Sequence, residues 1–145
     1  MTEENMAEKK DVIDVADFFT TTRAKEGVWY EPEIDGIGIG LEFRIYGQAS
    51  DKYVRSLDAY AKEHDRALKE TDPGAATEIE RQALADRAAT IVGGVRAKGG
   101  KALVCGKKEF KGTYEEIRSV MYENEDICID ILTAAAKNTT FMKRR

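Results

Sequence analysis

The sequence predicts an α+β fold, in which a small antiparallel β-hairpin packs on about four α-helices. Apolar and polar residues alternate on both sides of the turn dipeptide Asp35-Gly36, a pattern typical of a hairpin. Later segments carry apolar residues at helical spacing instead. The 145 residues, of which 42% are hydrophobic and 34% charged, suffice for one buried core. We expect a single domain over residues 25–145, preceded by a flexible or docked arm over residues 1–24.

The hairpin is expected to consist of strands at 27–33 and 37–46. In the first strand Val28 and Tyr30 point to one side and Trp29 to the other, with the period of two that strands require. In the second strand one face is apolar, formed by Leu41, Phe43 and Ile45. The preceding segment, residues 12–26, fits either a short helix or a strand-like arm, and the sequence does not decide between them.

Four helices are expected after the hairpin. Ser50 caps the first, whose inward face is predicted to carry Tyr53, Leu57, Tyr60 or Ala61, His64 and Leu68. The second opens at Pro73, carries an apolar stripe from Ile79 to Val92 and is stopped by Gly93-Gly94. Residues 95–112 are predicted to form an irregular hairpin or extended loop. Thr113 and Glu116 form a capping box for the third helix, and Asn124 restarts the fourth.

The bulk composition disfavours several classes of partner. The net charge is −4, so the chain has no general electrostatic affinity for phosphate backbones, and we expect no nucleic acid partner. No apolar run approaches the ~20 residues that cross a bilayer, and the N-terminus has no signal-peptide core, so we expect a cytoplasmic protein without a membrane partner. Cys105 and Cys128 are too few for a disulfide framework, which agrees with a reducing compartment.

Residues that could support catalysis are each better explained by structure. The glycines at 36, 38 and 40 follow a turn and precede a strand, unlike a phosphate-binding loop. His64 is the only histidine, and it lies at the spacing of the buried helix face. Cys128 lies on an apolar helix face and is expected in the core, whereas Cys105 has lysine neighbours and is the less certain of the two. We therefore expect no catalytic residue, no cofactor and no metal site.

Aromatic residues are concentrated on the hairpin, where Trp29, Tyr30, Phe43 and Tyr46 lie close together. They can cover the helices as part of the core, or one face can meet a partner, because aromatic residues anchor interfaces. Both interpretations can hold on opposite faces. The candidate partner-binding residues are Trp29, Tyr30, Tyr46, Tyr53 and Phe141.

The order of these segments resembles the tail assembly chaperone family of long-tailed, siphovirus-like bacteriophages. The resemblance rests on GVWYEPEI and IGLEFRIYG, on the capped helix beginning SDKY, on AATIVGGVR, and on the stretch from KEFKGTYEE to KNTTF. The last stretch matches the family's final helices, an acidic break between them, and a closing Asn-x-x-Phe, here Asn138 to Phe141. The resemblance as a whole covers about residues 25–142.

The resemblance implies a non-enzymatic, chaperone-like domain. Such a protein binds and solubilises the largely helical tape measure protein, helps to recruit tail tube subunits in the host cytoplasm, and is absent from the finished virion. Many members also have a longer form made by ribosomal frameshifting. Two alternatives stay open: a structural virion component, such as a head–tail connector or tail terminator, and a small ligand-binding or enzymatic domain that uses the 36–40 turn and His64. The sequence also leaves open whether the chain forms a homo-oligomer.

Overall fold

The computed structural model describes residues 11–142, so the first ten residues of the expected arm lie outside the described part. The chain has the predicted α+β fold. Its helices are α2 (Thr20–Glu26), α3 (Asp51–Lys69), α4 (Pro73–Thr90), α5 (Tyr114–Glu123) and α6 (Glu125–Ala135), with 3-10 turns η1 (Val15–Phe18) and η2 (Asn138–Phe141). Its strands are β1 (Val28–Tyr30), β2 (Glu33–Ile34), β3 (Ile37–Gly38), β4 (Leu41–Ile45), β5 (Val92–Ala97), β6 (Val104–Cys105) and β7 (Lys108–Glu109).

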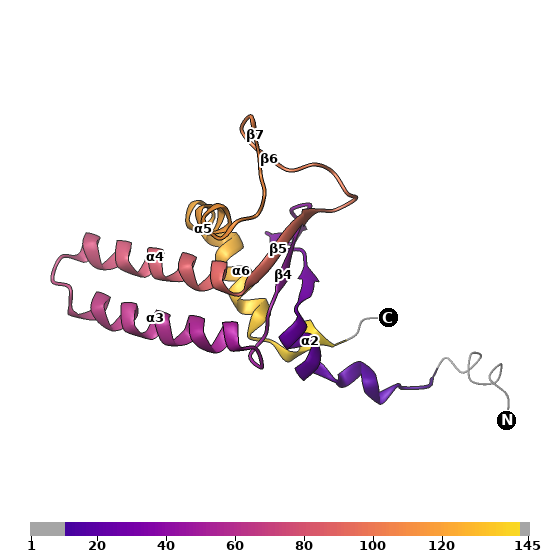
Figure 1. Cartoon of the computed structure of the whole chain (residues 1–145). Helices are drawn as coiled ribbons and strands as arrows, with labels where there is room; N and C mark the ends of the chain where they lie inside the picture. Colours follow the sequence, from indigo (N-terminus) through magenta and orange to yellow (C-terminus); the bar gives the residue numbers. More distant parts are fainter. Residues whose placement is uncertain (1–10, 143–145) are drawn as a thin grey trace, which may run out of the picture.

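The segment that the sequence left undecided is helical. Residues 15–18 form the turn η1 and residues 20–26 form α2, which packs against η2 near the C-terminus (Figure 1). Arg23 Nη1 donates a hydrogen bond to the carbonyl oxygen of Phe141 at 3.1 Å. The described arm is therefore docked at α2, whereas the side chains of Phe18 and Phe19 in front of it are 53% and 63% exposed.

The hairpin has the predicted turn and facing, but each expected strand is broken in two, so β2 and β3 form a separate two-stranded sheet beside the turn and β1 pairs with β4. Val28 pairs with Ile45, Trp29 with Arg44, and Tyr30 with Phe43. Phe43 and Ile45 are completely buried, as their alternation predicts. At the tip, Asp35 and Gly36 have φ angles of 53° and 79°. Positive φ at both central residues defines the tight hairpin turn that Asp-Gly favours.

The second predicted helix ends earlier than expected, and a third strand follows it. We predicted that the apolar stripe runs to Val92 and that the glycine pair stops the helix. Instead α4 ends at Thr90, and β5 pairs antiparallel with β4, so the sheet has three strands in the order β1-β4-β5.

Gly93 makes room for an aromatic ring on the outer face of this sheet. A Cβ atom on Gly93 would lie 2.4 Å from Tyr46 Oη, whereas one on Gly94 would lie 3.5 Å from the Trp29 ring, which is ordinary contact. Gly93 therefore has a packing role in a strand, although we predicted that the glycine pair stops a helix.

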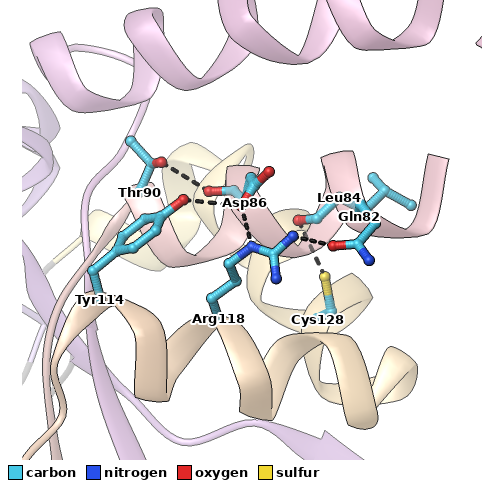
Figure 2. A network of polar contacts seen from close by, with 7 residues as sticks. All are labelled: Gln82, Leu84, Asp86, Thr90, Tyr114, Arg118 and Cys128. Carbon is cyan, nitrogen blue, oxygen red and sulfur yellow. Dashed lines mark hydrogen bonds and ion pairs between the residues drawn. The ribbon is translucent and has the colours of Figure 1, made fainter. Parts of the chain in front are cut away.

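Helix α4 is the central helix of the bundle. It packs against α3 along one side and against α5 and α6 along others (Figure 1). Between α4 and α5 runs a polar seam, in which Asp86 accepts hydrogen bonds from Tyr114 Oη at 3.0 Å and from Arg118 Nε (Figure 2). Arg118 also donates to Gln82. This seam fixes the rotation of α5 about its axis.

The core fills the space between the inner face of the sheet and helices α4, α5 and α6. Its largest fully buried side chains include Phe43, Ile45, Ile91, Ile131 and Phe141. The capping box predicted at the start of α5 is present, because Thr113 Oγ1 accepts from the Glu116 N–H and the Glu116 carboxylate accepts from the Thr113 N–H.

Candidate partner-binding surface

Two of the five candidate residues lie on the outer face of the three-stranded sheet. Trp29 is 39% exposed, and the guanidinium of Arg96 lies 4.1 Å from its ring centroid. Arg96 Nε in turn donates to Glu42 Oε1 at 2.8 Å. The guanidinium over the ring makes a cation–π contact that holds the indole in place and leaves part of it open to solvent.

Tyr46 lies at the other end of the same face. Its ring has the Lys52 ammonium at 4.9 Å and the Arg44 guanidinium at 5.7 Å from its centroid. Tyr46 is half-buried. Trp, Tyr and Arg are the residue types that most often dominate the energetics of protein interfaces. We call the group of Trp29, Arg44, Tyr46 and Arg96 the outer sheet face.

Of the other three candidate residues, two lie inside the protein. Tyr53 is 7% exposed and accepts a hydrogen bond from Arg87 of α4. Phe141 is 2% exposed and fills the core beside α2. We remove these two from the candidate surface because they are buried. Tyr30 is half-buried, and its Oη donates to Asp130 Oδ2 of α6 at 2.7 Å, so its role at an interface stays a prediction.

The inward face of α3 also differs from the prediction. The buried or half-buried side is formed by Tyr53, Ser56, Tyr60, Glu63 and Ala67. Of the residues that we expected inside, Leu57 is 44% exposed and Leu68 is 72% exposed. Tyr53 and Tyr60 lie on the inward side as predicted and face α4, where the guanidinium of Arg87 lies beside both rings.

The consequence is an exposed line of apolar side chains along α3, which we call the apolar row: Val54, Leu57, Ala61 and Leu68. Val54 is 51% exposed. If Val54 is position a of a heptad, Ala61 and Leu68 are also at a and Leu57 is at d. His64 is at the second d position, between Ala61 and Leu68. α3 is an outer helix that packs chiefly against α4, so the row faces solvent (Figure 1).

Sequence reasoning missed this surface although its signal was present. Two stripes of α3 have helical spacing: one mainly aliphatic and one containing Tyr53 and Tyr60. We assigned residues of both stripes to one inward face because their spacing is helical, and the structure confirms this for Tyr53 and Tyr60 but not for the leucines. The regular acids beside the aliphatic stripe, at positions 51, 58 and 65, mark it as the edge of a solvent-facing surface.

His64 and the cysteines lie in structural positions. His64 was expected half-buried in the core, but its side chain is 47% exposed, stacks on Tyr60 and contacts Glu80 of α4. Cys128 is buried as predicted, and its Sγ donates to the Leu84 carbonyl at 3.5 Å. Burial raises the pKa of Cys128 to about 11, so its thiol is protonated and unreactive at neutral pH. Cys105 is exposed on a projecting segment.

That projecting segment, residues 98–112, carries the short strands β6 and β7 away from the body of the protein (Figure 1). We call it the lysine arm, because it contains five lysines and a single acid, Glu109. At its base the Lys98 ammonium contacts Glu31 at 3.1 Å, and the Gly40 N–H donates to the same carboxylate at 2.8 Å. These contacts lower the pKa of Glu31, the Gly40 hydrogen bond contributing most.

No protein-family model matches the chain, and no significant match is found among curated proteins or solved structures. Within residues 11–142, no helix has both the length and the apolar character needed to cross a membrane. Over the same residues, His, Cys, Asp and Glu side chains do not gather in threes that could hold a metal ion. The surfaces described above are therefore the basis for a functional proposal.

Proposed function

We propose that the protein is a non-enzymatic assembly chaperone of a long-tailed bacteriophage, which binds the tape measure protein and keeps it from aggregating. The observation that carries this proposal is the apolar row of α3, which leaves aliphatic side chains at heptad spacing open to solvent. An amphipathic helix of a partner can lay its apolar stripe on such a row. A long helical protein needs this kind of cover, because exposed apolar stripes associate with one another.

The outer sheet face supplies a second surface for the same role. It lies on the sheet, whereas the apolar row lies on α3, so one chain can contact two partners. We propose that this face recruits tail tube subunits while α3 holds the tape measure protein. The net charge of −4 supports the role, since a charged chaperone disfavours association of its complexes. In this proposal the protein acts in the host cytoplasm and is absent from the finished virion.

The proposal is tested by the genes beside this one and by their products. A reading frame for a long helical protein should lie shortly downstream, and its product should stay in the supernatant only when co-expressed with this chain. Purified particles should lack the chain. If the helical product sediments equally with and without the chain, the chaperone proposal is wrong. If the chain remains in purified particles, it is a structural virion component.

A further inference from the structure

Acidic residues border the apolar row on its open side. Asp51, Asp58 and Asp65 are exposed and recur every seven residues, at position e of the heptad that places Val54 at a. We call these three residues the acidic flank. On the opposite side the row is bordered by α4, where the Glu80 side chain contacts His64 and accepts a hydrogen bond from Tyr60. A helix lying on the row thus meets three carboxylates along its open margin.

The basic residues of α3 lie further from the row. Arg55, Lys62 and Lys69 occupy position b, which is one step further round the helix than the acidic flank. Lys69 forms an ion pair with Asp65 at 3.0 Å. Within the described residues, Asp58 takes part in no ion pair. The carboxylates of the acidic flank therefore lie closer to a helix bound on the row than the basic side chains of α3 do. Asp58 is available to form an ion pair with that helix.

We propose that the apolar row docks an amphipathic helix whose own apolar stripe is flanked by Lys or Arg. This inference rests on the proposed function and specifies the surface and the chemistry of the segment that it binds. α3 has 19 residues and is about 28 Å long, so it can hold about two heptads of the partner.

The same charges argue against a second copy as the occupant. In an antiparallel pair of α3 helices, the acidic flanks of the two copies lie side by side, and like charges at such positions repel. In a parallel pair, each acidic flank faces the side of the other α3 that α4 covers. The charges therefore select a basic partner helix.

The test uses two synthetic peptides of four heptads each, with Leu at a and d and either Lys or Glu at e and g. Like charges at e and g keep each peptide from pairing with itself. Binding of each labelled peptide to the full-length protein is measured by fluorescence anisotropy at low and at high salt. We expect the Lys peptide to bind about tenfold more tightly than the Glu peptide, and the difference to shrink in high salt.

Two variants and two matched controls locate the contact. Leu57→Asp should weaken binding of the Lys peptide roughly tenfold or more, whereas Ile129→Asp on α6 should not, although both side chains are 44% exposed. Asp58→Lys should remove the preference for the Lys peptide, whereas Glu123→Lys, which changes the net charge equally, should keep it. All four positions are exposed, so the variants are expected to fold.

Each contrary result overturns a defined part of the inference. Equal binding of the two peptides, or tighter binding of the Glu peptide, refutes the basic partner. Unchanged binding by Leu57→Asp, or no binding of either peptide, refutes the apolar row as the docking surface. Self-association of the wild type that Leu57→Asp abolishes makes a second copy the occupant. The proposed function is tested separately, by co-expression of the wild-type chain with the tape measure protein, so failure of this inference is distinguishable from failure of the proposed function.

Discussion

Replacing Gly47 by Ala tests how the two ends of the chain are joined. A Cβ atom at this position would lie 2.6 Å from the Phe141 ring and 2.8 Å from the Ala24 methyl group. Phe141 is 2% exposed and Ala24 is 5% exposed, so neither can move into solvent. The backbone of Gly47 is also fixed, because its N–H donates to the Ala24 carbonyl at 2.9 Å and its carbonyl accepts from the Ser50 N–H.

The expected loss is large because the added methyl group overpacks a site that cannot expand. Inserting a methylene into a packed core costs typically 1–3 kcal/mol, and here two buried neighbours are displaced, so we expect about 2 to 3 kcal/mol. At about 2.1 cal/mol/K per residue, 145 residues have an unfolding entropy of about 0.3 kcal/mol/K. Gly47→Ala should therefore lower Tm by about 7 to 10 °C.

The matched control is the same substitution at Gly74, in the first turn of α4. The nearest atom to a Cβ there is Asp72 Oδ2 at 3.5 Å, which is ordinary contact. Gly74→Ala should raise the free energy of unfolding by about 0.4 to 1 kcal/mol, because it reduces the freedom of the unfolded chain. Combining Gly47→Ala with Phe141→Leu should cost less than the sum of the two. Urea unfolding of the wild type and the four variants measures these effects, and equal effects of Gly47→Ala and Gly74→Ala would refute the packing at Phe141.

Four further predictions concern other parts of the molecule. Thr113→Ala should lower the free energy of unfolding in urea by about 1 kcal/mol, because it removes the capping box of α5; an unchanged midpoint would contradict this. At pH 8 a thiol reagent should label Cys105 at once and Cys128 only as fast as the protein unfolds. Burial raises the pKa of Cys128 from 9.0 to about 11 in the folded protein. The protonated thiol therefore contributes its full share to the free energy of unfolding below pH 9, and this share is lost as the pH rises to about 11. The wild type should thus lose more stability over that range than Cys128→Ala, and equal losses would refute the assignment. Trypsin should cut first in the lysine arm, which is exposed and projects from the body; first cuts within α3 or α4 would contradict this arrangement.

The parts of the fold that sequence predicted correctly depend on local signals. The hairpin was predictable because Asp35-Gly36 selects its turn and the period of two selects its faces. The capping box at Thr113 was predictable because its two partners are only three residues apart. Such features need no knowledge of distant contacts.

The errors arose where a distant contact decides between two local possibilities. Gly93 and Gly94 fit a helix stop as well as a strand, and only the pairing of β5 with β4 and the Tyr46 ring against Gly93 show that they belong to a strand. In α3 both stripes have helical spacing, and the position of Arg87 on α4 draws the tyrosines inward.

The candidate site was predicted in part for the same reason. Trp29 and Tyr46 lie on the outer sheet face, because the alternation along their strands is a local property. Phe141 lies in the core, since α2 and η2 pack together across most of the chain length. The apolar row became visible only when the neighbours of α3 were known, because exposure is a property of the whole fold.

The most direct test of the central claim is to co-express the long helical protein encoded beside this gene with three forms of the chain. These forms are the wild type, Leu57→Asp and Ile129→Asp, and the measurement is the fraction of the helical protein that stays in the supernatant. We expect the wild type and Ile129→Asp to keep the helical protein in the supernatant, and Leu57→Asp to fail to do so. If Leu57→Asp protects the helical protein as well as the wild type does, the apolar row of α3 is not the surface that holds it.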